Sequence, residues 1–227
     1  MIDRDGDLSA LSVGERAYTQ LRDDIFSATL LPDARLRLDE LKKRYGVSVT
    51  TLREVLSRLA MEGFVVAEGN RGFAVSPVSR AELREVGELR VLLENHALGL
   101  SFAAGDVDWE ARVLAAHHRL KHSEAGVISG DDSQRLRWKR DDMAFHQALI
   151  SACGSATLMR THSQVFDRYN RYLMLALTSR GDETAKDHAT LMQHALDRNT
   201  AAAQAVLAQH VAVGIEHAIA AETLPEG

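Results

Sequence analysis

The strongest local pattern in this sequence lies between Leu41 and Val66, in LKKRYGVSVTTLREVLSRLAMEGFVV. It predicts two short helices, over residues 38–45 and 49–62, whose apolar positions recur at helical spacing. Gly46 separates them, because a tight turn there needs a residue that tolerates a positive φ. Two short helices joined in this way predict a helix-turn-helix.

The residues on either side complete this unit. A further helix is expected from about Ser12 to Leu30, and Pro32 ends it because proline disfavours helix in the residue before it. After the helix-turn-helix, residues 64–67 and 72–75 favour two short strands with a turn at 68–71 between them. Three helices followed by a two-stranded hairpin predict a winged helix-turn-helix.

Beyond Ser76-Pro77-Val78-Ser79 the strand pattern disappears and the chain favours helix. We therefore expect a mainly α protein in three parts. These are a winged helix-turn-helix over residues 1–76, a linker over 77–79, and an antiparallel all-helical bundle over 80–227. The bundle helices are expected at 80–104, 107–124, 131–153, 155–178, 184–197 and 200–222.

Composition excludes several classes of protein. Hydrophobic residues make up 45% of the chain, which excludes an intrinsically disordered protein because that content can offset chain entropy. No apolar run reaches the roughly 18 residues of a membrane helix, and the first residues lack the order of a signal peptide. Cys153 is the only cysteine, which excludes an internal disulfide and a thiolate metal cluster. These features predict a soluble cytoplasmic protein with no membrane partner.

The net charge is −5, so any contact with nucleic acid must come from a local patch. Residues 35–58 provide one, because basic residues outnumber acidic ones there by seven to three. Ser48, Thr50 and Thr51 lie at the start of the third helix, where hydroxyls and free backbone N–H groups can bind phosphate. Thr50 and Arg53 share a face that could enter a major groove, with Arg53 reaching base edges or phosphate. A solvated helix hairpin of mixed charge is the alternative.

Two further places are candidates for DNA contact. Arg35 begins the basic stretch and suits a phosphate contact. Gly69, Asn70 and Arg71, at the tip of the hairpin, could touch the DNA backbone or minor groove. A tight-turn role for Gly69 and Asn70 is the alternative.

The helical half contains candidate metal ligands. Asp142 and His146, in DDMAFH, are four residues apart and project from one helix face, where both can chelate one ion. His188 and His210 lie on the last two helices, and an antiparallel return of the chain can bring their imidazoles together. One carboxylate and three imidazoles suit Zn²⁺, Ni²⁺ or Mn²⁺. The alternatives are a surface hydrogen bond for the first pair and helix-end interactions for the histidines.

Other histidines leave the choice of ligands open. His118 and His122 form a rival pair four residues apart, in a sequence typical of a solvated face. His194 and His217 also lie on the last two helices, and His162 has no partner that spacing can name.

The N-terminal half resembles the GntR family of bacterial transcription regulators, because GVSVTTLREVLSRLAMEGFV is similar to that family's recognition-helix motif. The resemblance implies a winged-helix homodimer bound to a double-stranded DNA operator with two-fold symmetry. Val49 and Asp39 depart from residues common in relatives, and both changes weaken phosphate or base contacts. The family's DNA contacts fall here on Ser48, Thr50, Thr51, Arg53 and the wing at Gly69, Asn70 and Arg71.

Residues from about 80 to 215 resemble the ligand-binding FCD domain of the FadR subfamily of these regulators. The similar stretches are ELRVLLE, DDMAFHQALISACGS, DHATLMQHALDRN and LAQH. In this family a metal is commonly held by an aspartate and three histidines. Asp187 stands beside the site where glutamate is commoner. The family's ligand positions fall here on Asp142, His146, His188 and His210.

The resemblance also implies an effector, a small organic acid that binds the metal through one oxygen. Arg90 matches a family position that faces the effector cavity, and a buried arginine there needs an anionic partner such as a carboxylate. An ion pair with Glu94, four residues further on, is the alternative. Asn170 and Arg171 are further candidates for lining this cavity.

Together these features predict a ligand-responsive, DNA-binding transcription regulator, a repressor of a catabolic operon, rather than an enzyme. A metal-dependent hydrolase built on the helical half is the alternative, although no motif provides its general base. A metal sensor, in which the ion itself is the signal, is another.

Overall fold

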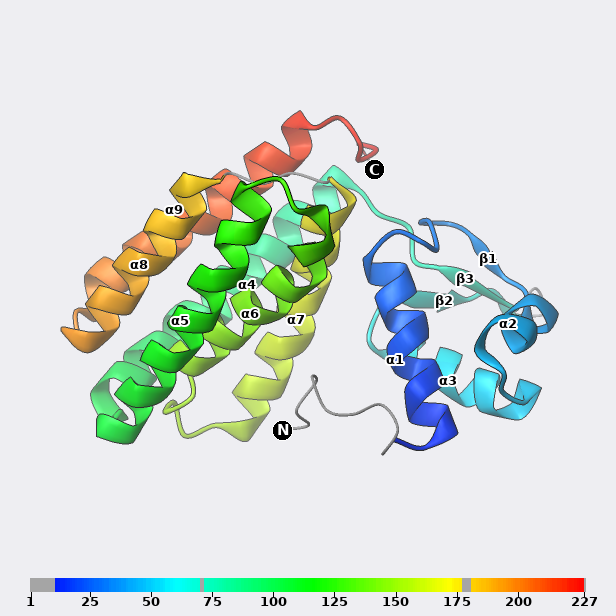
Figure 1. The fold of residues 1–227 in the computed structure, drawn as a ribbon, viewed down its shortest axis with the longest axis horizontal. Helices are drawn as coiled ribbons and strands as arrows, with labels where there is room; N and C mark the ends of the chain where they lie inside the picture. Colours follow the sequence, from blue (N-terminus) through cyan, green and yellow to red (C-terminus); the bar gives the residue numbers. More distant parts are fainter. Residues whose placement is uncertain (1–10, 70–71, 177–180, 227) are drawn as a thin grey trace. The chain divides into compact units, whose positions relative to one another are not determined.

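The structure is a computed structural model that describes residues 11–69, 72–176 and 181–226. The chain divides into two compact units, Met1–Val78 and Ser79–Gly227, and the division falls within the stretch predicted as a linker. Figure 1 shows that the first unit combines helices with a short sheet, whereas the described part of the second is helical.

The first unit contains the three predicted helices. They are α1 (Val13–Phe26), α2 (Leu38–Tyr45) and α3 (Val49–Met61). Helix α2 ends at Gly46, whose φ of 66° is the left-handed conformation that the turn requires. Helix α3 packs on α1 and α2 through a buried stripe, formed by Leu52, Val55, Leu56 and Leu59.

The wing differs from the prediction by one strand. The sheet has three strands, β1 (Arg35–Leu36), β2 (Val65–Ala67) and β3 (Phe73–Val75), in the antiparallel order β1-β3-β2. Strand β1 pairs Arg35 with Ala74, and two residues are too few to show the alternation that predicts a strand. The prediction of a two-stranded wing was therefore incomplete.

The first helix is also shorter than predicted. It ends at Phe26, and Ser27 caps it by donating its backbone N–H to carbonyls of the last turn. Ala28 follows with a φ of 59°, a left-handed conformation that takes the chain out of the helix before Pro32. The proline is therefore not what ends this helix.

The second unit is a bundle whose helices begin near the predicted breaks. Ser79, Asp106, Ser155 and Asn199 each accept a backbone N–H and cap the helix that follows. The helices are α4 (Arg80–Ala104), α5 (Val107–Ile128), α6 (Arg135–Leu149), α7 (Ala156–Leu175), α8 (Asp182–Leu196) and α9 (Thr200–Ala220). A short 3₁₀ turn, Asp132–Gln134, precedes α6.

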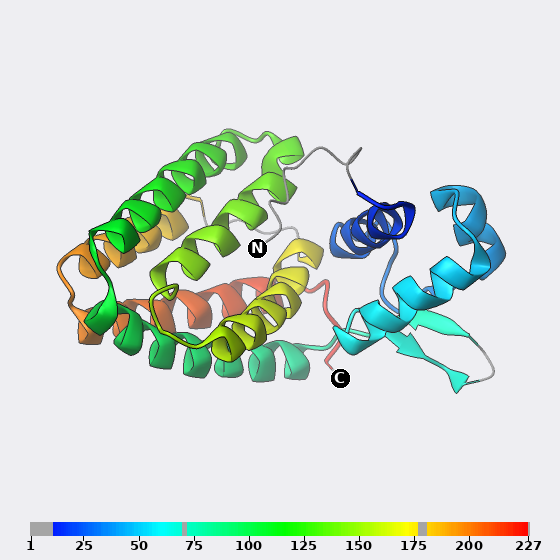
Figure 2. The same ribbon diagram turned by 90° about the horizontal axis from the view of Figure 1, so that it is seen from below.

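The bundle helices close into a ring (Figures 1 and 2). Helix α4 packs on α7 and α9, α7 on α6, α6 on α5, α5 on α8, and α8 on α9. Gly87 allows α4 and α9 to approach closely, because a Cβ there would lie 2.5 Å from Cδ1 of Ile215. The interior of this ring can therefore receive side chains from all six helices. Among the described residues, the helices are too short or too polar to cross a lipid bilayer.

Candidate metal site and nucleic-acid interface

Three histidines and an aspartate meet inside the bundle. His146 comes from α6, His188 from α8 and His210 from α9, and one ring nitrogen of each lies within 4.8 Å of the others. Asp142, one turn before His146, places Oδ1 3.6 Å from Nε2 of His146 and 3.3 Å from Nε2 of His188. All four side chains are buried. The structure thus brings together the four residues that sequence and resemblance named as metal ligands.

Each histidine of this cluster is oriented by an acidic side chain at Nδ1. The pairs are His188 with Glu124 at 2.7 Å, His210 with Asp187 at 3.1 Å, and His146 with Glu94. A carboxylate at Nδ1 leaves Nε2 to face the cluster, which is the arrangement that most metal-binding histidines show.

These acids were largely missed in the sequence. Glu124 lies on α5, 64 residues before His188, and no local motif connects the two. Glu94 was considered only as an ion-pair partner. In the structure it also accepts a hydrogen bond from Nε2 of His162 at 3.1 Å, so His162 has a buried partner that spacing could not name.

The cluster contains polar atoms that a cation would satisfy. Oδ1 of Asp142 and Nε2 of His188 are buried, and neither has a well-aligned hydrogen-bond partner among the described residues. Such atoms are costly unless something binds them. The imidazole and carboxylate donors fit Zn²⁺, Ni²⁺ or Mn²⁺.

The protonation states of the cluster follow from burial and charge. Burial alone would raise the pKa of Asp142, but Lys139 and His188 hold it well below its usual value. Burial lowers the pKa of His146 and His210, so both rings are neutral at pH 7. Burial would lower the pKa of His188 as well, but the adjacent carboxylates outweigh it and raise the pKa to about 9.

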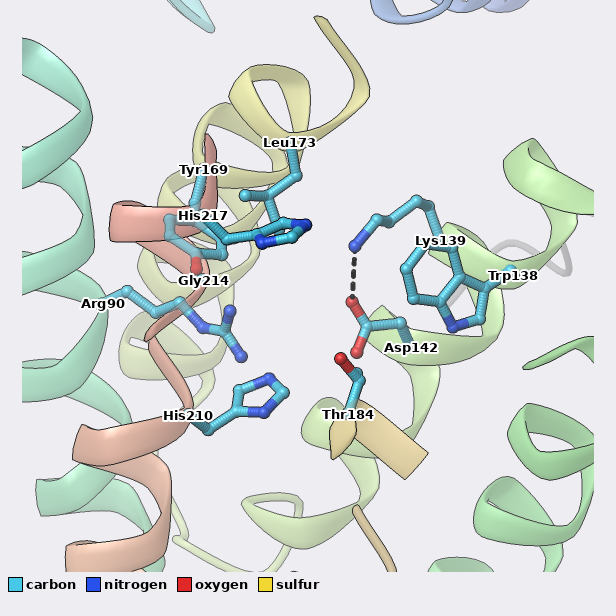
Figure 3. Close-up of a pocket in the computed structure, with 10 residues that line it drawn as sticks. All are labelled: Arg90, Trp138, Lys139, Asp142, Tyr169, Leu173, Thr184, His210, Gly214 and His217. Carbon is cyan, nitrogen blue, oxygen red and sulfur yellow. Dashed lines mark ion pairs between the residues drawn. The ribbon is translucent and has the colours of Figure 1, made fainter. Parts of the chain in front are cut away.

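A cavity of ≈ 30 Å³ adjoins the cluster (Figure 3). Figure 3 shows Lys139 and Asp142 approaching from one side and Arg90 with His210 from the other. The volume of the cavity suits a water molecule or an ion, so a larger ligand requires side chains to move. The lining residues are Arg90, Trp138, Lys139, Asp142, Tyr169, Leu173, Thr184, His210, Gly214 and His217.

Arg90 lies on the cavity wall and also pairs with Glu94. It lines the cavity, and its Nε also donates to Oε2 of Glu94 at 3.1 Å. Its guanidinium lies 4.0 Å from the centre of the Phe166 ring, and Nη2 is 3.2 Å from each ring nitrogen of His146. Arg90 is therefore a buried cation, 1% exposed, that is held in place on the cavity wall.

Asn170 and Arg171 are buried on α7 but are not among the side chains that line the cavity. Tyr169 and Leu173 line it instead. These two residues are four apart and share one helix face, whereas the next two positions after Tyr169 point about 100° and 200° away from it. Neither side chain lines this cavity, and a role for Asn170 and Arg171 in effector binding stays a prediction.

The rival histidines are dispersed. His118 and His122 are exposed on α5, as the flanking charges indicated. His217 lines the cavity but is not one of the three clustered histidines, and His194 lies in the last turn of α8 outside both groups.

In the first unit, Thr50 and Arg53 are exposed on α3, on the side away from its buried stripe. Ser48 is the N-cap of α3 and accepts the backbone N–H of Thr51 at 3.1 Å. The hydroxyls of Ser48 and Thr51 are also 2.9 Å apart. The hydroxyls of Ser48 and Thr51 thus stabilise the start of α3, while the side chains of Thr50 and Arg53 remain accessible on its polar face.

Two other predicted DNA contacts, Arg35 and Gly69, lie in the described part of the wing. Arg35 is exposed on β1, next to β3 in the sheet. Gly69 is exposed and has a φ of 56°, so its tight-turn role is evident in the backbone. Asn70 and Arg71 lie outside the described residues.

Two family models match the chain. The model described as "Bacterial regulatory proteins, gntR family" matches residues 13–75, and the FCD domain model matches residues 85–213. These ranges correspond to the two compact units.

Curated relatives and solved structures agree with these matches. The HTH-type transcriptional regulator BphR of Paraburkholderia xenovorans is 35% identical over 88% of this chain and 82% of its own. The HTH-type transcriptional repressor GlaR of Escherichia coli is 34% identical over 86% of this chain and 90% of its own. The structure of McbR/YncC from E. coli has a TM-score of 0.75 at 21% identity and covers 92% of this chain and 98% of its own. A GntR-type regulator from Rhodococcus sp. RHA1 has a TM-score of 0.73 at 21% identity, covering 92% of this chain and 99% of its own.

Proposed function

Because the chain belongs to the GntR family of bacterial regulatory proteins and carries an FCD domain, we propose that it is a repressor controlled by a small organic acid held at a metal ion. Its relatives are transcriptional regulators rather than enzymes, so the chain is a transcriptional regulator. The hydrolase alternative is therefore set aside. Repression is supported by GlaR, which is named a repressor.

The metal proposal is carried by one observation, the convergence of Asp142, His146, His188 and His210. Each histidine has a carboxylate at Nδ1, and two facing atoms of the cluster, Oδ1 of Asp142 and Nε2 of His188, are buried without a well-aligned hydrogen bond. These four residues would hold a divalent ion, most simply zinc, with nickel or manganese as alternatives. When bound, the ion would supply a Lewis-acidic point that attracts a carboxylate or hydroxyl oxygen.

The acid proposal is supported by the chemistry of the cavity. Its wall carries the Arg90 guanidinium and the Lys139 ammonium, and both are buried. Cations in a buried cavity favour an anionic ligand because desolvation strengthens their attraction for it.

The proposed DNA contacts are Arg35, Thr50, Arg53 and the N-terminus of α3, together with the wing residues Gly69, Asn70 and Arg71. GntR regulators bind DNA operators, and the exposed face of α3 suits a major groove. In this proposal Arg53 reaches base edges or phosphate, and Ser48 and Thr51 hold the helix end that faces the backbone.

We further propose a homodimer on an operator with two-fold symmetry. Exposed leucines along α4, at Leu89, Leu92 and Leu100, offer an apolar face for such an assembly. Acid binding would shift the bundle and change the spacing of the two recognition helices. The acid can change the free energy of DNA binding by no more than the difference between its binding free energies for the two conformations of the protein.

The test is selection of genomic fragments by the purified zinc-loaded protein, followed by footprinting. The proposal predicts a protected, roughly palindromic site beside genes for the breakdown of an organic acid. Protection should disappear when that acid is added. No selective protection at low salt, with and without zinc, would contradict the DNA-binding part.

Footprinting during a zinc titration distinguishes the acid-responsive repressor from a metal sensor. A sensor would release or bind DNA when zinc is titrated into apo-protein, with no acid present. The acid-responsive repressor keeps its footprint across that titration and loses it only when acid follows.

A further inference from the structure

We propose that His217 stands at the mouth of the cavity and is the first residue to bind a divalent ion on its way to the buried cluster. In this role His217 is a transient ligand, which speeds entry and release but does not belong to the site that finally holds the ion. This inference rests on the proposed function, because it assumes that Asp142 and the three clustered histidines hold the ion. It adds the route by which the ion arrives.

The exposure of the lining residues locates the mouth of the cavity. Among the residues that line it, only His217 is exposed, and Leu173 and Gly214 are partly exposed. The remaining lining residues are buried. Leu173 lies on α7, and Gly214 and His217 lie on α9, so the cavity opens to the surface between these two helices.

His217 and the cluster are connected along one face of α9. His217 follows His210 by seven residues, which is two helical turns, or about 10 Å along the helix axis. Gly214 lies between them and also lines the cavity (Figure 3). A Cβ at Gly214 would lie 2.5 Å from the hydroxyl oxygen of Tyr169, so the close approach of this tyrosine requires a glycine. Between the two histidines, α9 therefore presents backbone rather than a side chain to the cavity.

The charges behind the mouth oppose the entry of a free ion. Arg90 and Lys139 lie buried on the cavity wall, and their positive charge repels a hydrated dication where little solvent screens it. An imidazole at the mouth binds the ion before it meets these cations and replaces part of its water shell. His217 suits this role, because it makes no hydrogen bond or ion pair with another residue that the structure describes.

The next ligand along this route is His210, which lines the same cavity and belongs to the cluster. The cluster offers four protein ligands, whereas His217 offers one, so the ion moves inward. The affinity of the protein for the ion is therefore determined by the cluster, and the rate of exchange by His217.

Zinc kinetics test this role. His217→Phe keeps a ring of similar size but removes both nitrogens. Uptake by apo-protein and release to excess chelator, each followed by stopped-flow with a fluorescent zinc dye, should both slow by roughly five- to tenfold. The dissociation constant should stay within about twofold of wild type, because a group that acts only at the barrier changes both rates equally. His122→Phe, which changes an exposed histidine on α5, is the matched control and should keep wild-type rates.

Two further variants separate metal binding from packing. His217→Asp replaces the imidazole by a carboxylate, which also binds zinc, and should keep both rates near those of the wild type. Leu173→Trp narrows the mouth from α7 while His217 stays in place, so it should slow uptake and release together. Leu114→Trp, at an exposed position on α5, should slow neither.

The inference fails on several results. Wild-type rates in His217→Phe would overturn it, and so would equal slowing in His217→Asp, which would indicate a packing role. Faster release with weaker affinity in His217→Phe would make His217 a ligand of the bound ion, and unchanged rates in Leu173→Trp would exclude this route. A wild type that takes up no zinc would overturn the metal-centred function and this inference together.

Discussion

Glu124 on α5 accepts a 2.7 Å hydrogen bond from Nδ1 of His188 on α8, and both side chains are buried. The bond fixes the orientation of the imidazole, so that Nε2 faces Asp142 at 3.3 Å. Glu124, which would not itself contact a metal ion, therefore determines that Nε2 is the nitrogen of His188 available to bind one.

Replacing Glu124 tests this relationship. Glu124→Gln keeps the size of the side chain and an acceptor oxygen. It removes the negative charge that makes the His188 imidazole a stronger ligand for a metal ion. Zinc affinity should fall roughly 10- to 100-fold. Glu183→Gln, an exposed acid on α8, is the matched control. Equal zinc affinities for the two variants would show that Glu124 does not support the site.

The pKa values predict proton release on metal binding. At pH 7, Asp142 is ionised and His146 and His210 are neutral, whereas His188, with a pKa of about 9, carries a proton. Binding of zinc should therefore release about one proton per chain. Calorimetry in buffers of different ionisation enthalpy measures this number. Release near zero or near three would contradict the assigned states.

The same pKa predicts how apo-protein stability depends on pH. The folded-state pKa of His188 is raised from 6.5 to about 9, so its protonated form favours the folded state. This contribution is complete below pH 6.5 and is lost as the pH rises to about 9. The difference in thermal midpoint between the wild type and His188→Gln, both without metal, should therefore shrink over that range. A difference that grows with pH would have the wrong sign.

The two roles of Ser48 can be separated. Ser48→Ala removes the N-cap of α3 and should cost about 0.5–2 kcal/mol of stability in the first unit. Ser48→Asp keeps a capping oxygen but places a negative charge where DNA phosphate is proposed, so it should fold normally and bind DNA weakly. Thermal melts and a binding titration at fixed salt measure both effects. Wild-type DNA affinity in Ser48→Asp would remove Ser48 from the interface.

Arg53 should contribute to DNA affinity and not to folding, because it is exposed on α3. Arg53→Ala should weaken binding to the selected fragment by roughly 10- to 100-fold with an unchanged melting temperature. Arg53→Lys keeps the positive charge and distinguishes a contact to phosphate from a contact to a base edge. It should restore binding if Arg53 meets phosphate, but not if it binds a base edge in a bidentate manner. Full affinity in Arg53→Ala would refute either role.

Local sequence patterns predicted most of the fold. The bounds of α2 and α4 match the expected ranges, because glycine turns, serine caps and apolar spacing all act within a few residues. Strand β1 was missed because its two residues are defined only by pairing with β3. Helix α5 continues through Gly126, where a break was expected, because packing overrides the weak helix propensity of glycine.

The site was predictable to the extent that its contacts are local or shared with a family. The spacing of Asp142 and His146 places both on one face of α6. The meeting of His188 and His210 depends on how α8 and α9 pack, which spacing suggested and the family resemblance sharpened. Glu124 belongs to the site only through the packing of α5 on α8, so no local pattern in the sequence identified it. Lys139 lies three residues before Asp142 on α6, a spacing that places both on one helix face, but the prediction did not use it.

The most direct test of the metal-centred account is the metal content of the protein, purified without chelators and measured by mass spectrometry. We predict about one divalent ion per chain in the wild type and loss of that ion, together with a lower melting temperature, in His188→Ala. His122→Ala, which changes an exposed histidine, should retain the ion. A wild type that takes up no divalent ion even when supplied with zinc, or a His188→Ala variant with full occupancy, would contradict the account.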